Sequence, residues 1–580
     1  MKPFSRIETL WGIMSVGAAI VALRLFDLQV MEHAAYWGAA ERNRVQVIHE
    51  TAPRGRFFDR NGVLLASNRL SFSVVYFPRE AAAEKELEPL SRALAPELRL
   101  APGDILGKLR EAEKEKTTIR LAEDIPLREM FRLSELKVRY PGIYLVREAQ
   151  RDYPDGVLAG HLIGYLGKMA PRAWRHLKRL GYRIDSRVGR FGLEKVFEDV
   201  LRGQDGGIDL EVDARGRLQR ILGRRAGVPG NDVYLTIDSK IEKAASDGLA
   251  SSPTRRGAAV AIDPRTGAIL ALVSAPEFDP GDFLSEEVTP GSVSEFDRAI
   301  SGTYPPGSTF KIVVGAAGLN NDKFSIKDQV LCKGFFDLGP QVFLCWNHKG
   351  HGLISWYRAV AQSCDVYFYE MGLRTGPGLI EDYERRFGFG AKTGLSLPGE
   401  AAGKLAGPDS LPRGRRRWRQ GDTVNLSIGQ GGLLATPLQM ATMIAAVAQR
   451  GKRWRPYYTD HIVYSGELGT YRQKPHLLGK IDLKSEVWAD LEQALALVVS
   501  SGTGAAAAIP GLEVRGKTGT AQNPHGRDHA WFVGYAGLPG EAARIAVAVL
   551  VENGGHGGSA AAPIAREMFR AAFRDQTKSS

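Results

Sequence analysis

The alternation of hydrophobic and polar residues divides the chain into three stretches. Residues 10–30 are apolar apart from two charges, a pattern that predicts one helix long enough to cross a membrane. Residues 44–230 mix short strand-like runs with charged helical segments, and we expect an elongated α+β module there. Residues 231–574 are richer in apolar runs and predict a second α+β domain, which a loose tail at residues 575–580 follows.

The second domain contains an apolar hairpin and, much later in the chain, three more apolar strands. The hairpin turns at residues 263–267, read DPRTG. Strands that are apolar on both faces must be covered on both, so we expect a five-stranded, mainly antiparallel sheet between helices. The predicted strands are residues 258–262, 268–273, 513–521, 530–536 and 543–551.

The N-terminal apolar run has two interpretations. Lys2 and Arg6 precede it, so as an uncleaved anchor it would keep residues 1–9 in the cytoplasm and the rest of the chain outside the inner membrane. As a signal peptide it would be cleaved near the small residues 38–40. Those residues lie far beyond the apolar run, which favours a single-pass anchor.

Composition narrows the function classes only slightly. With 44% hydrophobic and 24% charged residues, the 580-residue chain is typical of a folded protein. Its net charge of +12 suggests attraction to an anionic surface, but no zinc-finger, RNA-recognition or helix-turn-helix signature accompanies it. We therefore expect no nucleic-acid partner.

A hydroxyl and an amine lie three residues apart in the apolar helical stretch 305–319. They belong to Ser308 and Lys311. An amine surrounded by apolar side chains has a depressed pKa and can take the proton of the serine. Chance also produces such pairs in a long chain, so this motif decides nothing alone.

Two later motifs complete a set. Ser363 and Asp365 follow another apolar helical run, and residues 517–520, read KTGT, lie in a predicted strand whose glycine lets a ligand backbone approach. Residues 511–518 also match the phosphate-binding pattern G-x-x-x-x-G-K-T, but the residues after them break any helix. A nucleotide-binding function is therefore not expected, since that loop needs a helix to follow.

The three motifs resemble, in order and separation, the S-x-x-K, S-x-N and K-T-G motifs of the penicilloyl serine transferases. Other segments resemble class B high-molecular-weight penicillin-binding proteins, and some are similar to the elongation-type branch, penicillin-binding protein 2. The resemblance implies a penicillin-binding-protein/β-lactamase-like transpeptidase domain at residues 231–574, after a dimerisation-type pedestal at 44–230. The segments are residues 54–56, 59–62, 192–194, 263–267 and 427–431 for the class, and 153–165, 345–352 and 363–369 for the branch.

The resemblance implies a periplasmic D,D-transpeptidase that cross-links peptidoglycan during cell elongation through a serine acyl-enzyme. Its partners would be stem peptides ending in D-Ala-D-Ala, a glycan polymerase of the SEDS family and other membrane proteins of the elongation complex. β-Lactams would inhibit it, and the chemistry would need no cofactor. A D,D-carboxypeptidase and a β-lactam-binding sensor are the alternatives.

The resemblance implies catalytic roles for the residues of this chain that match the family's motifs. Ser308 would be the nucleophile, Lys311 its base, and Ser363 the relay of a proton to the departing D-alanine. The family's oxyanion hole would consist here of the backbone N–H groups of Ser308 and Thr520. Positioning of the substrate carboxylate would fall to the third motif, Lys517, Thr518, Gly519 and Thr520.

One position departs from the family pattern. Asp365 stands where the family has Asn, and an ionised carboxylate cannot donate a hydrogen bond as an amide does. Our hypothesis is that Asp365 pairs with Lys311 or Lys517 and helps to fix them.

The chain's only cysteines cluster between the first and second motifs. Cys332, Cys345 and Cys364 together with His351 would make a closed tetrahedral set for structural zinc, and His348 could replace His351. A disulfide between Cys332 and Cys345 with a buried free Cys364 is the alternative.

Overall fold

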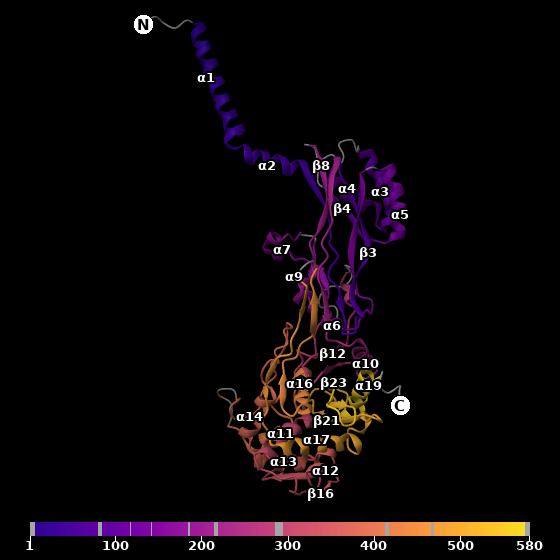
Figure 1. Ribbon diagram of the computed structural model, residues 1–580, viewed down its shortest axis with the longest axis vertical. Helices are drawn as coiled ribbons and strands as arrows, with labels where there is room; N and C mark the ends of the chain where they lie inside the picture. The colour runs from indigo at the N-terminus through magenta and orange to yellow at the C-terminus, as the bar shows by residue number, and fades with distance from the viewer. Residues whose placement is uncertain are drawn as a thin grey trace, which may run out of the picture. The chain divides into compact units, whose positions relative to one another are not determined.

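The computed structural model describes most of the chain and divides it into two compact units (Figure 1). Unit 1 consists of residues 1–54, 68–150 and 202–230, and unit 2 of residues 55–67, 151–201 and 231–580. The units thus interleave along the chain, unlike the contiguous ranges proposed from the sequence. The predicted tail at 575–580 lies outside the described residues, which are 6–78, 84–115, 118–140, 142–183, 186–213, 218–284, 294–411, 414, 417–465 and 469–574.

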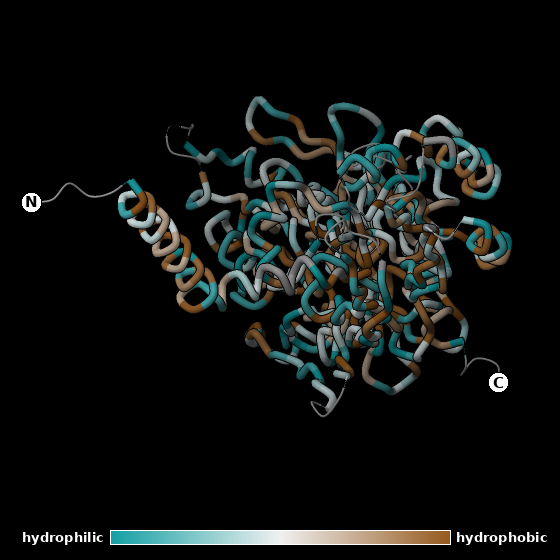
Figure 2. The backbone as a smooth tube through the Cα atoms, turned by 90° about the horizontal axis from the view of Figure 1, so that it is seen from above, coloured by the Kyte–Doolittle hydropathy of each residue, from teal (hydrophilic) through white to brown (hydrophobic). Residues whose placement is uncertain are grey.

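Unit 1 begins with the predicted apolar helix. Helix α1 (Arg6–Phe26) continues through a π-helical turn (Asp27–Met31), and together they are long and apolar enough to cross a membrane. No residue of α1 is buried, and Figure 2 shows brown, hydrophobic stretches along its tube. The helix supports a single-pass membrane anchor, which α2 (His33–Arg44) follows.

The rest of unit 1 is a mixture of sheets and helices. Strands β1 (Val45–Glu50), β8 (Gly206–Val212) and β9 (Leu218–Arg225) form an antiparallel sheet in that order. A separate core joins three helices to strand β3 and its neighbours. These elements are α3 (Glu84–Leu98), α4 (Pro102–Glu115), α5 (Leu127–Arg139), β3 (Leu64–Tyr76), β4 (Ile119–Ile125) and β5 (Ile143–Asp152).

Unit 2 contains the predicted five-stranded antiparallel sheet, in the order β12-β11-β23-β22-β21. Along β23, Val547 and Val549 pack with α10 and α19, whereas Ala548 and Leu550 face the opposite core with α16. Two buried faces explain why the strands are apolar throughout. The elements are β11 (Gly257–Ile262), β12 (Ile269–Ala275), β21 (Glu513–Ala521), β22 (His529–Gly537), β23 (Ile545–Val551), α10 (Ser239–Ala250), α16 (Pro437–Ala448) and α19 (Ala562–Ala572).

A helical layer carries most of the candidate site. Helix α11 (Lys311–Asn320) is enclosed as predicted, since every residue from Lys311 to Leu319 is buried. It packs against α13 (Asp365–Thr375), α14 (Pro377–Phe387) and α17 (Ser485–Ser500), while α15 (Gln420–Ser427) packs on α13 and α12 (Trp356–Ala361) on α17.

Short elements complete unit 2. A second sheet has the order β19-β18-β10-β2 and continues into the start of β3, and three strand pairs are β6 with β7, β13 with β16, and β14 with β15. Their bounds are β2 (Phe57–Phe58), β6 (Leu166–Lys168), β7 (Arg187–Gly189), β10 (Asp232–Leu235), β13 (Val330–Cys332), β14 (Phe335–Leu338), β15 (Gln341–Leu344), β16 (Gly352–Ile354), β18 (Thr459–Val463) and β19 (Thr470–Arg472). A further pair is β17 (Lys452–Trp454) with β20 (Leu477–Lys480), and the short helices are α6 (Gly160–Ile163), α7 (Pro171–Leu177), α8 (Gly192–Val196), α9 (Glu198–Leu201) and α18 (Gly557–Ala560).

Candidate active site

Ser308 lies in a tight turn at the entrance to α11. The turn is a 3-10 helix (Gly307–Phe310), so the α-helix begins only at Lys311. Gly307 has a φ of +56°, which a glycine adopts without strain, and the Thr309 hydroxyl donates a 2.6 Å hydrogen bond to the Pro306 carbonyl. This local bonding holds the half-buried Ser308 at the edge of the domain core.

Strand β21 packs directly against that turn. A Cβ atom on Gly519 would lie 2.9 Å from Thr309 Cγ2 and 3.0 Å from the Pro306 carbonyl oxygen. We expected this glycine to admit a ligand backbone, but the nucleophile turn itself occupies the space. Residues 513–518 are extended within β21, so the phosphate-loop pattern forms no phosphate-binding turn.

Two buried amines meet at one hydroxyl. Lys517 Nζ donates a 2.9 Å hydrogen bond to Ser363 Oγ, and Lys311 Nζ approaches the same oxygen at 3.3 Å. Lys311 also donates to the Ser363 carbonyl at 2.9 Å. Ser363 has a φ of +54° between α12 and α13, an uncommon conformation for a residue with a side chain. The structure therefore brings three residues from distant parts of the sequence into one cluster.

Asp365 completes this cluster. Its Oδ1 lies 2.7 Å from Lys311 Nζ, and its Oδ2 accepts a 2.8 Å hydrogen bond from the Trp346 backbone N–H. The lysine side chain is only 1% exposed, so water screens this ion pair weakly. The predicted pairing of Asp365 with a motif lysine is confirmed, and Lys311 is the partner.

The electrostatics of the cluster act most strongly on Lys517. Burial and the nearby Lys311 lower the pKa of Lys517 well below its usual value, while Asp365 acts in the opposite direction. Two ammonium groups beside one hydroxyl repel each other, and one carboxylate cannot neutralise both. The cluster therefore favours the loss of a proton from Lys517.

Three contacts at the first and third motifs could not be found from sequence patterns. Gln430 Nε2 donates to the Thr520 carbonyl at 3.3 Å, and the Gly429 carbonyl accepts a hydrogen bond of 2.9 Å from Gly307 N–H. The hydroxyls of Thr518 and Thr503 are 2.6 Å apart. Residues 427–431 were recognised only by resemblance, because nothing in their composition indicates which turn they touch.

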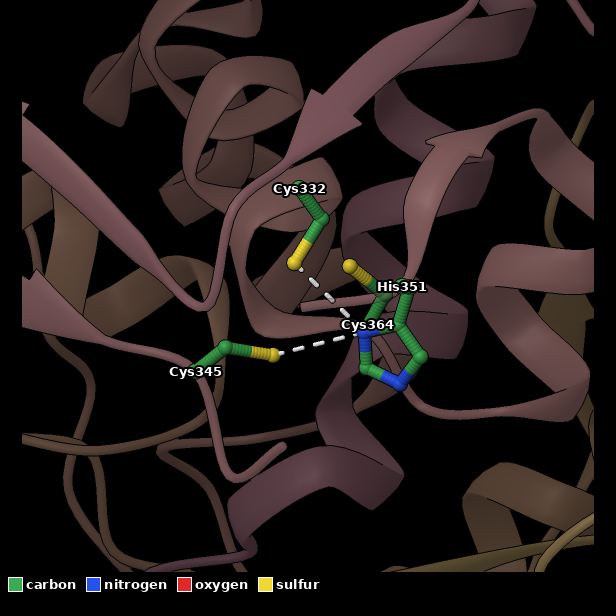
Figure 3. A group of neighbouring side chains, drawn as sticks. All are labelled: Cys332, Cys345, His351 and Cys364. Atoms are coloured by element: carbon green, nitrogen blue, oxygen red, sulfur yellow. Dashed lines mark hydrogen bonds between the residues drawn. The ribbon is translucent and has the colours of Figure 1, made fainter. Parts of the chain in front are cut away.

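The cysteine cluster lies next to this site in the sequence, since Cys364 separates Ser363 from Asp365. The four candidate ligand atoms of Cys332, Cys345, His351 and Cys364 all lie within 4.8 Å of one another (Figure 3). The Cys332 and Cys345 sulfurs are 3.5 Å and 3.6 Å from His351 Nδ1. All three cysteines are free, so the structure does not contain the alternative disulfide.

Two family models match the chain. The penicillin binding protein transpeptidase domain matches residues 257–570, and the penicillin-binding protein dimerisation domain matches residues 49–235. A curated relative, the peptidoglycan D,D-transpeptidase MrdA of Acinetobacter baumannii, is 34% identical over 96% of this chain and 86% of its own length. The chain is an elongation-type class B penicillin-binding protein.

Solved structures agree with the membership in this family. The penicillin-binding protein resembles the Helicobacter pylori PBP2 in a complex with MreC, with a TM-score of 0.74 and 27% identity over 92% of this chain and all of that one. It also resembles a chain of a peptidoglycan synthase complex that couples polymerization and crosslinking, with a TM-score of 0.71 and 29% identity over 98% of both chains. The penicillin-binding protein is thus a serine-type transpeptidase with a pedestal domain and no cofactor requirement for its chemistry.

Proposed function

We propose that this penicillin-binding protein cross-links peptidoglycan on the periplasmic side of the inner membrane, with stem peptides ending in D-Ala-D-Ala as its donors. The observation that carries the proposal is the convergence of Lys311 and Lys517 on Ser363, beside the Ser308 turn. Helix α1 would anchor the protein, with residues 1–9 in the cytoplasm. The transpeptidase domain would span residues 231–574 and the pedestal residues 44–230.

The first half-reaction forms an ester on Ser308. Its Oγ attacks the carbonyl carbon between the two D-alanines, and Lys311, in its neutral amine form, takes the hydroxyl proton. The C–N bond then breaks, and Ser363 passes a proton to the departing amine, which leaves as D-alanine. The backbone N–H groups of Ser308 and Thr520 would stabilise the negative charge on the carbonyl oxygen.

The second half-reaction moves the acyl group to an amine of a neighbouring stem peptide. That amine attacks the ester carbonyl carbon and gives up a proton to Lys311. The new C–N bond forms, the ester C–O bond to Ser308 breaks, and the Ser308 oxygen takes the proton from Lys311. Lys517, Thr518 and Thr520 would hold the substrate carboxylate, with Gly519 keeping the strand against the nucleophile turn. β-Lactams would react by the first half only and leave a slowly hydrolysed ester.

Labelling with a fluorescent penicillin tests this proposal. We expect the wild-type protein to be labelled covalently and Ser308→Ala to stay unlabelled. Incubation with a synthetic donor and an amine acceptor should then give a cross-linked product. Release of D-alanine without any cross-link would indicate the D,D-carboxypeptidase alternative, and labelling without turnover would indicate the sensor.

We also propose that Cys332, Cys345, His351 and Cys364 hold a structural zinc ion. Zinc–sulfur bonds are about 2.3 Å long, so ligand atoms at these separations can all reach one ion. The ion would fix the residues on both sides of Cys364, and thereby the second motif.

Metal analysis decides between zinc and the disulfide. The purified protein should contain about one equivalent of zinc per chain, as closed four-ligand sites do. Less than half an equivalent, together with a Cys332–Cys345 disulfide detected by mass spectrometry, would refute the site.

The partners proposed for this protein follow from its relatives. The H. pylori PBP2 forms a complex with MreC, and the synthase complex joins polymerization to crosslinking. We infer that this chain likewise assembles with an elongation-complex protein of the MreC kind and with a SEDS-family glycan polymerase. Purification from membranes through a tag on this chain should recover both, and recovery of neither would contradict the assignment.

A further inference from the structure

A threonine hydroxyl that the proposed reaction does not use contacts the third motif. Thr503 lies in the loop that follows α17, and its Oγ1 is 2.6 Å from Thr518 Oγ1. Thr518 is only 6% exposed, and it is one of the residues proposed above to hold the substrate carboxylate. Thr503 lies outside all three motifs, so the reaction as described so far gives it no role.

Backbone contacts fix the loop of Thr503 beside the second motif. The Thr503 N–H donates a 3.1 Å hydrogen bond to the carbonyl of Ala361, which ends α12 two residues before Ser363. A Cβ atom on Gly502 would lie 2.3 Å from the same carbonyl oxygen, and one on Gly558 would lie 2.5 Å from the Thr503 carbonyl oxygen. These close approaches hold the Thr503 backbone in place independently of its hydroxyl.

The chemistry of the substrate decides which of the two threonines donates. A hydroxyl has one proton, and an ionised carboxylate can only accept hydrogen bonds. When Thr518 holds the carboxylate, its proton points to the substrate, and its oxygen can only accept from Thr503. Thr503 is then the donor across the 2.6 Å contact. The two hydroxyls form a chain that ends on the carboxylate, and each hydrogen bond in such a chain polarises the next.

We infer that Thr503 is a positioning residue, which directs the Thr518 proton toward the carboxylate of the donor peptide and of β-lactams. A hydroxyl rotates freely until a partner fixes it, so a partner already in place lowers the entropic cost of recognition. The inference rests on the proposed function, because it needs a substrate carboxylate at Thr518. Its effect is confined to carboxylate recognition, since the contacts of Lys311 and Lys517 with Ser363 do not involve Thr503.

The test compares two probes on the full-length protein in detergent. One probe is a penicillin, and the other is its methyl ester, which has no ionised carboxylate. Mass spectrometry of the intact protein measures the second-order rate of acylation by each probe. Thr503→Val keeps the shape of the side chain but has no hydroxyl. It should slow acylation by the penicillin about three- to tenfold, the range of one hydrogen bond, and change acylation by the ester less than about twofold.

Three further variants provide the controls. Thr503→Ser keeps a hydroxyl and should react with the penicillin within about twofold of the wild-type rate. Thr442→Val removes a half-buried hydroxyl that donates to the Gln439 carbonyl at 2.9 Å within α16, and it should alter neither rate. In a Thr518→Val background, Thr503→Val should cause no further loss with the penicillin, because the hydroxyl that it orients is absent.

Each failure gives a distinct result. Equal slowing of both probes by Thr503→Val would make the role of the residue purely structural and would overturn the inference. An unchanged rate with the penicillin, or a further loss in the Thr518→Val background, would overturn it as well. If the proposed function is wrong, the wild-type protein forms no ester with the penicillin at all. The inference then falls with it, because Thr518 would have no substrate carboxylate to hold.

Discussion

Asp365 connects two parts of the active site through its two carboxylate oxygens. One oxygen pairs with Lys311, and the other accepts the backbone N–H of Trp346, which follows Cys345 of the metal-ligand set. An Asn at this position could accept only one of these hydrogen bonds through its oxygen. The Asp therefore couples the amine of the first motif to the loop that carries Cys345.

Removal of this carboxylate should slow acylation. Asp365→Ala leaves Lys311 buried without its ion-pair partner, and we expect the second-order rate of penicillin acylation to fall at least tenfold, as for the loss of a buried charge partner. Stopped-flow labelling with a fluorescent penicillin measures that rate. Asp382→Ala, which removes a half-exposed partner of Arg386, is the matched control and should leave it unchanged. An unaltered rate in Asp365→Ala would refute the role.

At the level of single residues, the sequence identified the catalytic side chains but not the residues that contact them. Ser308, Lys311, Ser363 and Lys517 belong to three short motifs that lie far apart in the chain, and the resemblance to the penicilloyl serine transferases predicted that they meet. Gln430 contacts Thr520, which lies 90 positions further along the chain, and nothing in its local pattern indicates that contact. Such contacts depend on how separate elements pack, which a single sequence does not specify.

A buried acidic residue lies between α10 and the sheet. Glu242 is fully buried, and one of its oxygens accepts a 2.7 Å hydrogen bond from the backbone N–H of Leu272 in β12. Burial, with smaller contributions from the nearby Glu277 and Asp297, raises the pKa of Glu242 to about 8. The carboxyl group is therefore neutral in the folded protein at mildly acidic pH.

This residue should make folding stability depend on pH. The folded pKa lies above the unfolded value, so the stabilisation is complete below about pH 4.5 and is lost as the pH rises through about 8. Glu242→Gln has no proton to lose. Relative to the wild type, its free energy of unfolding should rise by about 2 to 4 kcal/mol between pH 5 and pH 8, measured by urea denaturation. The exposed control Glu567→Gln should show no such change, and parallel curves for Glu242→Gln would contradict the prediction.

The elements that could be predicted are those that bury two faces. All five strands of the sheet were expected near their observed positions, because uninterrupted apolar runs bounded by turns have few other solutions. The short pairs β13 with β16 and β14 with β15 were not predicted. Their side chains are largely exposed, so no periodic pattern marks them.

At the scale of the whole molecule, the membrane anchor and the catalytic residues belong to different compact units. Every residue assigned a catalytic role belongs to unit 2, whose two main hydrophobic cores contain no residue of α1 or α2. Unit 2 nevertheless includes residues 55–67 and 151–201, so a chain cut at residue 230 would lose part of it. A deletion from the N-terminus that preserves the fold must therefore stop before the first residue of β1.

A chain that begins at Val45 should keep its chemistry and lose its membrane attachment. Since no residue of α1 is buried, its removal exposes no protein core. We expect the full-length protein to remain in the membrane pellet after an alkaline carbonate wash and the truncated protein to be soluble. Both should react with fluorescent penicillin at rates within about twofold, because every residue assigned a catalytic role belongs to unit 2 and the truncation removes none of that unit. If the full-length protein also washes off and its N-terminus maps near residue 40, the apolar helix is a cleaved signal peptide and not an anchor.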